Sequence, residues 1–93
     1  MQKGDVVLVP FPFTDLTGSK FRPALVLFPS LKDVTVAFIT TQIKLCKETD
    51  IKLKPSSKNG LKKISVLLLD KIATLEKSSV VGKLGNYQLK RLF

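Results

Sequence analysis

The sequence predicts a single, mainly β domain: a small barrel or sheet of twisted antiparallel strands with short helices. The length of 93 residues suits one domain. Apolar segments rich in β-branched and aromatic residues recur along the chain, and clusters of Gly, Pro, Asn and Ser separate them. With 44% hydrophobic and 25% charged residues, the composition is typical of a globular chain rather than a disordered one.

The first expected strand covers residues 5–13, DVVLVPFPF, which are dense in β-branched and aromatic side chains. Pro10 and Pro12 have no N–H to donate, so the second half of this strand should lie at a sheet edge or in a bulge. The polar residues 14–20, TDLTGSK, should then form a loop, because Gly18 and its neighbours interrupt regular structure.

Two strands are expected next. Pro23 disfavours a helical backbone at Arg22, and ALVLF, residues 24–28, follows as a short buried strand. DVTVAFIT, residues 33–40, has the clearest strand pattern in the chain. Alternation places Val34, Val36, Phe38 and Thr40 on one of its faces and Thr35, Ala37 and Ile39 on the other.

The middle of the chain contains a second group of expected strands. Residues 41–49, TQIKLCKET, are ambiguous between the end of a strand and a loop. DIKLK, residues 50–54, alternates apolar and basic residues and predicts a half-exposed strand. Residues 55–63 contain an Asn-Gly pair, which predicts a turn, and ISVLLLDKIATL, residues 64–75, predicts a long strand.

The last residues are expected to be helical. Helical pieces are predicted within residues 76–93, EKSSVVGKLGNYQLKRLF. Asn86 is the expected N-cap of a short last helix, because its side chain can accept a hydrogen bond from the first helical N–H groups.

Charge and composition restrict the function. The formal net charge of +9 predicts an acidic partner, such as nucleic acid or an acidic protein. The absence of histidine removes the commonest metal ligand and the usual acid–base side chain near neutral pH. The one cysteine, Cys46, excludes an intramolecular disulfide. A cytoplasmic location is expected, since a long apolar run is missing and Asp5 with two prolines interrupts any signal-peptide pattern.

Three ordered segments of the chain resemble one protein family. They are GDVVLVPFPFTDLTGSKFRPALVL from Gly4, VAFITTQI from Val36 and SVLLLDKIATLEKSSVVGKLG from Ser65. Their sequences and their order are similar to those of the MazF/PemK toxins of bacterial type II toxin–antitoxin modules. The resemblance implies an SH3-like barrel of the CcdB/PemK type, usually assembled as a homodimer.

The same resemblance implies an activity and partners. Family members are mostly endoribonucleases that need no metal or other cofactor and cut single-stranded RNA at short sequences, which inhibits translation and growth. The 2′-hydroxyl attacks its own phosphodiester and leaves a cyclic phosphate and a 5′-hydroxyl. An acidic antitoxin, and through it operator DNA, are the implied partners. Because a toxin of the same fold inhibits DNA gyrase, the alternative is inhibition of a protein target or RNA binding without cleavage.

The resemblance also implies a site. The family's arginine before proline is Arg22 here, and the threonine of its Ile-Thr element is Thr40; these two are the expected catalytic residues. The residues expected to contact RNA are Thr14, Ser19, Lys20, Phe21, Thr41, Gln42 and Lys44. Asp70 is a candidate general base, in Leu68-Leu69-Asp70, where some members have Arg-x-Asp. Relatives usually continue into a longer C-terminal helix than this chain has.

The residue types fit this chemistry, except for the base. A guanidinium binds phosphate oxygens through two parallel hydrogen bonds, so Arg22 suits the charge that develops on phosphorus. Its pKa above about 12 makes it a poor proton shuttle. Thr40 or Thr41 can donate to a phosphate oxygen, and Gln42 can bind a base edge. The base stays open among the carboxylates Asp15, Glu48, Asp70 and Glu76.

Two further interpretations stay open. Seven lysines fall within residues 44–63, namely Lys44, Lys47, Lys52, Lys54, Lys58, Lys62 and Lys63. They form either a rim that follows RNA phosphates or a solvated strand edge protected from aggregation. Asp70 is either the base or the partner, in an ion pair, of Lys71 or of a lysine on a neighbouring strand.

Overall fold

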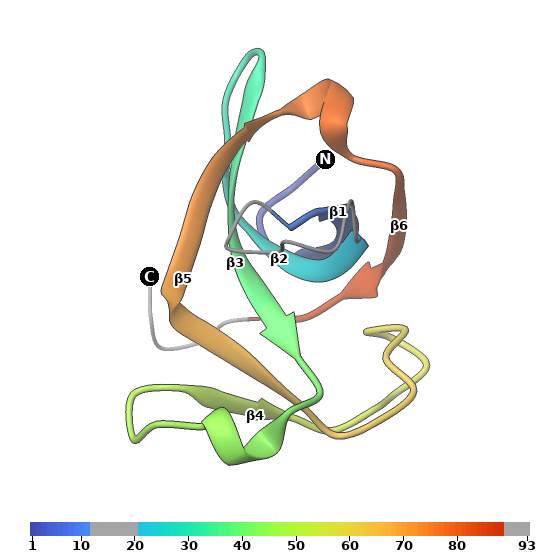
Figure 1. Ribbon diagram of the computed structural model, residues 1–93. Helices are drawn as coiled ribbons and strands as arrows, with labels where there is room; N and C mark the ends of the chain where they lie inside the picture. The colour runs from blue at the N-terminus through green and yellow to red at the C-terminus, as the bar shows by residue number, and fades with distance from the viewer. Residues whose placement is uncertain (12–20, 89–93) are drawn as a thin grey trace.

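The computed structural model describes residues 1–11 and 21–88, which form one antiparallel sheet of six strands (Figure 1). The strands are β1 (Asp5–Pro10), β2 (Phe21–Pro29), β3 (Asp33–Thr40), β4 (Ile51–Leu53), β5 (Ser65–Glu76) and β6 (Gly82–Asn86). Their order across the sheet is β4-β5-β3-β2-β1-β6. The sheet curls into a half-barrel, with the 3-10 helices η1 (Ile43–Leu45) and η2 (Lys77–Ser79) in its connections. The predicted mainly β fold is confirmed.

The alternation predicted for β3 is observed, and both faces of this strand are buried. Its two faces belong to two separate apolar clusters. One cluster consists of Val6, Leu25, Leu27, Ala37, Ile39, Leu53 and Leu67. The other consists of Val7, Val9, Ala24, Val26, Val34, Val36 and Phe38. A single sheet can bury both faces because its twist and curl bring strands from its two halves over each other.

Strand β5 bends in the middle of its pairing with β3 (Figure 1). Ala37 pairs with Ile72 and Ile39 pairs with Leu67, so only Phe38 stands against residues 68–71 of β5. Such a bulge increases the local twist and turns the strand. Before the bulge, β5 pairs with β4 on one side and with the end of β3 on the other, and after it β5 continues along β3 alone.

The connection from β4 to β5 crosses to β6, the opposite edge of the sheet. The backbone N–H of Asn86 donates to the carbonyl of Lys58 at 2.7 Å. A Cβ atom at Gly60 would collide with the backbone of Leu84, and one at Gly85 would collide with that of Lys58. Gly60 also has a φ of 71°, a conformation that favours glycine. The two glycines therefore let backbone pack on backbone, and the loop joins the two edges of the half-barrel.

The helical prediction for residues 76–93 is wrong where it meets β6. Gly82 and Gly85 are poor helix formers, and the segment gains a hydrogen-bonded ladder with β1 instead. Asn86 is the last residue of β6 and residues 87 and 88 are not helical, so its predicted role as an N-cap is also wrong. The short η2 is helical as expected, and residues 89–93 lie outside the described residues.

The other strand boundaries differ by a few residues. β1 ends at Pro10, and the ladder to β6 ends at Leu8, so Pro10 has an open edge on that side, as predicted. β2 begins at Phe21, three residues before the predicted start. The ambiguous residues 41–49 form η1 and a turn. The predicted loop at 14–20 lies outside the described residues.

Among residues 1–11 and 21–88, no helix has the length and hydrophobicity that a membrane span requires.

Candidate functional site

A cavity of about 550 Å³ opens where the start of β2, the end of β3 and the loop before β5 meet. Its lining residues come from four places in the sequence. They are Phe21, Arg22, Pro23, Ile39, Thr40, Thr41, Gln42, Gly60, Leu61, Lys62, Lys63, Ser65 and Leu84. Five of the residues predicted for the RNA site, Phe21, Arg22, Thr40, Thr41 and Gln42, are therefore brought together here.

Arg22 lies at the edge of the second apolar cluster. Its guanidinium carbon is 5.8 Å from the centre of the Phe11 ring, a distance at which the cation is attracted to the ring face. Phe11 in turn contacts the buried Phe38 edge-on, with ring centres 5.1 Å apart. One N–H of Arg22 donates to the carbonyl of Phe21 at 3.3 Å. A guanidinium has five N–H donors, so this bond leaves donors for a phosphate.

Thr40 is on the same face of the sheet as Arg22. The β2–β3 ladder ends with Ala24 opposite Phe38, and Arg22 and Thr40 lie two residues farther along their strands. Side chains alternate along a strand, so both side chains project to the face of Ala24 and Phe38. The Thr40 hydroxyl oxygen accepts a hydrogen bond from the backbone N–H of Gln42 at 3.1 Å. The hydroxyl hydrogen stays available to donate to an anion.

The remaining predicted contact residues are placed differently. Phe21 is 47% exposed, which leaves its ring open to a stacking partner. Lys44 lies in η1, immediately after the cavity residues, and is not among the residues that line it. Thr14, Ser19 and Lys20 lie outside the described residues.

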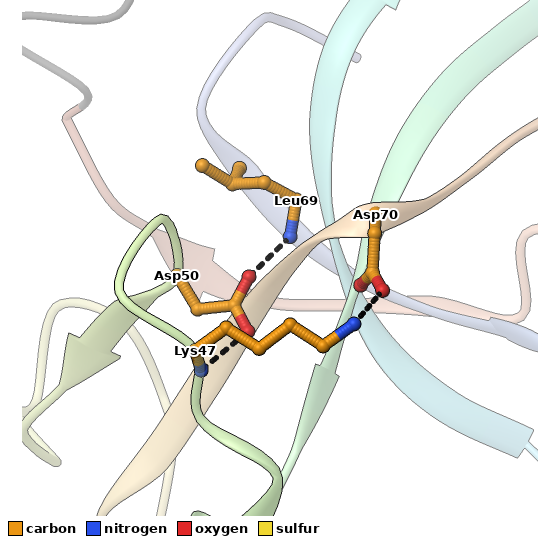
Figure 2. Close-up of polar contacts among 4 residues, drawn as sticks. All are labelled: Lys47, Asp50, Leu69 and Asp70. Atoms are coloured by element: carbon orange, nitrogen blue, oxygen red, sulfur yellow. Dashed lines mark hydrogen bonds and ion pairs between the residues drawn. The ribbon is translucent and has the colours of Figure 1, made fainter.

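Asp70 is in the bulge of β5 (Figure 2), and it is not among the residues that line the cavity. Its carboxylate accepts a hydrogen bond from the Lys47 ammonium at 2.6 Å. That hydrogen bond is the main cause that lowers the pKa of Asp70 below its usual value, and the same bond raises the pKa of Lys47. Leu68, where some relatives have arginine, is buried. The geometry supports the ion-pair interpretation of Asp70, with a partner, Lys47, that follows η1 and does not lie on a neighbouring strand.

Asp50 joins the same cluster through backbone contacts (Figure 2). One carboxylate oxygen accepts from the N–H of Lys47 and the other from the N–H of Leu69, each at 3.1 Å. These bonds attach the turn after η1 to the bulge of β5. We call this group of Lys47, Asp50, Leu69 and Asp70 the bulge latch.

Lys62 and Lys63 were missing from the predicted site, although the sequence shows them within the lysine cluster. Their place depends on the docking of the loop on β6, a long-range contact that leaves no periodic signal. Arg22, Lys62 and Lys63 give the cavity three cationic side chains, and no Asp or Glu of the described chain lines it. The arrangement favours a polyanion with an aromatic or apolar part, because Ile39, Leu61 and Leu84 are also in the lining.

Within residues 1–11 and 21–88, no group of three or more His, Cys, Asp or Glu side chains could hold a metal ion.

Residues 2–92 match the family model described as PemK-like, MazF-like toxin of type II toxin-antitoxin system. The chain belongs to this toxin family. The match covers nearly all of the 93 residues and confirms the resemblance seen in the sequence. A type II toxin has an antitoxin as its partner, so the family also implies one for this toxin. A search of curated proteins gave no match.

Proposed function

We propose that this toxin is an endoribonuclease that cuts single-stranded RNA without a metal or cofactor and thereby inhibits translation. The observation that supports this most directly is the cavity that brings Arg22, Thr40 and Gln42 together beside the exposed Phe21 ring. These side chains offer a phosphate-binding fork, a hydroxyl donor, an amide and a stacking surface. Membership of the toxin family makes RNA the expected substrate.

In the proposed reaction the 2′-hydroxyl of one nucleotide attacks the adjacent phosphorus. The P–O bond to the next nucleotide breaks, the 2′-hydroxyl loses its proton to solvent and the leaving 5′-oxygen takes one up from solvent, which leaves a 2′,3′-cyclic phosphate on one product and a 5′-hydroxyl on the other. Arg22 binds the oxygens on which charge accumulates, and the Thr40 hydroxyl donates to one of them. Gln42 binds a base edge next to the cut, and Phe21 stacks on a base.

Asp70 has a different role in this proposal. Its carboxylate is paired with Lys47 and lies outside the cavity lining, so we assign it to the bulge latch rather than to proton transfer. Arg22 and Thr40 act on the phosphate charge by electrostatic stabilisation, and no carboxylate from residues 1–11 and 21–88 lines the cavity.

The proposed assembly follows the family. The chain forms one toxin domain that acts in the cytoplasm as a homodimer, and an acidic antitoxin inhibits it. A chain with a net charge of +9 attracts an acidic segment by long-range electrostatics, which favours such a partner.

The test is cleavage of a long single-stranded RNA by the purified toxin in EDTA, followed by mapping of the cut ends. We expect discrete cuts with 5′-hydroxyl ends, and we expect Arg22→Ala to abolish them. Arg22→Lys keeps the charge but loses the fork, so it should retain only a small part of the rate. The proposal fails if the wild-type protein makes no discrete cuts, or if the Arg22→Ala protein cuts equally well.

A further inference from the structure

We propose that residues 55–63 form a second wall of the RNA site, held in place by docking on β6, and that Lys62 and Lys63 on this wall bind phosphates next to the cleaved bond. The inference rests on the proposed endoribonuclease function and adds substrate-binding residues to it. Arg22 and Thr40 come from the ends of β2 and β3, whereas Lys62 and Lys63 reach the same cavity from the loop before β5.

Asn59 makes this wall rigid. Its side chain is 3% exposed, and its oxygen accepts from the N–H groups of Ser56 at 3.1 Å and Leu61 at 2.9 Å. Its amide nitrogen donates to the carbonyl of Lys54 at 2.8 Å. A buried amide with its hydrogen bonds satisfied fixes one backbone conformation, since any other conformation would leave polar atoms unpaired. Leu61, one of these partners, directly precedes Lys62.

Docking on β6 then fixes where the wall stands. The Asn86 N–H donates to the Lys58 carbonyl. Because Gly60 and Gly85 have no Cβ atom, the backbone of the loop and the backbone of β6 occupy space that a side chain would otherwise fill. Gly82, on the same strand, has nothing within 4 Å of an added Cβ. The close approach is therefore a local feature of the crossing and not a general property of β6.

The structure also divides the lysine cluster into different environments. Lys62 and Lys63 line the cavity, while Lys47 is paired with Asp70. Lys52 lies in the edge strand β4, Lys54 directly follows it, and neither lines the cavity. The two interpretations of the cluster thus apply to different members: Lys62 and Lys63 suit phosphate binding, and Lys52 and Lys54 suit a charged strand edge.

The first experiment measures binding without cleavage. The probe is a single-stranded RNA oligonucleotide with 2′-O-methyl sugars, which cannot undergo internal attack, and its affinity is measured over a range of NaCl concentrations. We expect Lys62→Ala with Lys63→Ala to weaken binding and to reduce the slope of log K against log salt by about 1.4, at about 0.7 for each lost phosphate contact. The matched control is Lys52→Ala with Lys54→Ala, which removes the same charge and should leave the slope nearly unchanged. Equal slope changes in the two double variants would overturn the proposal.

The second experiment moves the wall without touching the lysines. Gly85→Ala inserts a methyl group into the crossing, and Gly82→Ala is its control on the same strand. We expect the slope of log K against log salt to fall as much in folded Gly85→Ala protein as in the double lysine variant. Combining Gly85→Ala with the two lysine substitutions should reduce the slope no further. A folded Gly85→Ala protein with the wild-type slope would contradict the docking role. If Gly85→Ala does not fold, Asn59→Ser takes its place with the same expected result.

The two proposals fail in different ways. Suppose that the salt slope of probe binding depends on Lys62 and Lys63 but the wild-type protein cuts no RNA. The endoribonuclease proposal is then wrong, and the proposal that the wall binds phosphates is retained. If the wild-type protein and the variant with Lys62→Ala and Lys63→Ala cut RNA with equal kcat/KM, the proposal that the wall binds phosphates is wrong and the endoribonuclease proposal is retained.

Discussion

Thr40 connects the backbone turn after β3 to the proposed chemistry. Its hydroxyl oxygen is occupied by the N–H of Gln42, so the direction of its hydrogen is restricted toward other acceptors. The same bond ties the position of Gln42 to that of Thr40. A single side chain can therefore shape the turn and act on a phosphate.

The first prediction concerns this hydroxyl. Thr40→Val keeps the shape but removes the donor and the acceptor, so we expect RNA cleavage to fall by about 100-fold to 1000-fold, as for loss of one preorganised donor. Thr40→Ser keeps the hydroxyl and should retain most of the rate. Single-turnover cleavage at saturating protein measures the change. Equal rates for the valine and serine variants would show that Thr40 acts through packing alone.

A second prediction concerns Asp50 in the bulge latch. In Asp50→Asn one oxygen is replaced by an N–H₂ group, which faces a backbone N–H and cannot accept from it. We expect a loss of about 1–3 kcal/mol in the free energy of unfolding, the usual range for an unsatisfied group of this kind. Urea denaturation measures the loss. The control is Glu48→Gln, an exposed position on the same turn, which should change stability little.

At the scale of elements, the bulge latch attaches η1 and the turn after it to the bend of β5. Residues 68–71 stand against one residue of β3, and Asp50 supplies a partner for the N–H of Leu69 within that irregular stretch. This turn follows η1, and η1 begins directly after Gln42, which lines the cavity. The bulge latch therefore links the bulge of β5 to the segment that follows the cavity residue Gln42.

The third prediction is the pH dependence of the ion pair in this latch. The pKa of Asp70 is lowered in the folded protein, so the pair stabilises the fold at pH values above the unfolded carboxyl pKa and stops doing so as pH falls through the lower folded value. The wild-type protein should thus be more stable than Asp70→Asn at neutral pH, and the difference should shrink as pH falls below about 3.8, the usual carboxyl value, and disappear only below the lower folded pKa.

Urea denaturation at a series of pH values tests this dependence, and cleavage assays of the same Asp70→Asn protein test its role in the reaction. Because Asp70 lies outside the cavity lining, we expect cleavage at neutral pH to stay close to the wild-type rate. If Asp70→Asn reduced the cleavage rate as much as Thr40→Val does, Asp70 would have to be considered the general base of the reaction.

Local patterns in the sequence were sufficient to predict most of the strands. The alternation in residues 33–40 predicted both faces of β3, because each residue there has the same environment as its second neighbour. β6 was missed because its strand state depends on pairing with β1, far away in the sequence, and not on the propensity of Gly82 or Gly85. The family resemblance placed Arg22 and Thr40 in one site, whereas Lys62 and Lys63 required the loop contact with β6.

At the scale of the whole molecule, charge and fold act together. The chain carries 16 basic and 7 acidic residues, and three of the basic side chains line one cavity. The rest of the positive charge attracts polyanions from a distance, and the cavity then selects the part of the ligand that fits. Selection between RNA and an acidic protein thus depends on the cavity residues rather than on net charge.

The fourth prediction follows from this separation of roles. A polyglutamate peptide has the charge of an acidic antitoxin without its sequence, so it should inhibit RNA cleavage by occupying the positive surface. Since long-range attraction is screened by salt, a rise from 50 to 200 mM NaCl should greatly weaken the inhibition, at RNA concentrations adjusted to equal fractional saturation. The inhibition constant, measured at both salt concentrations, decides the result. Inhibition that does not change with salt would mean that the peptide binds through specific contacts, and charge attraction could not then support the proposal of an acidic antitoxin.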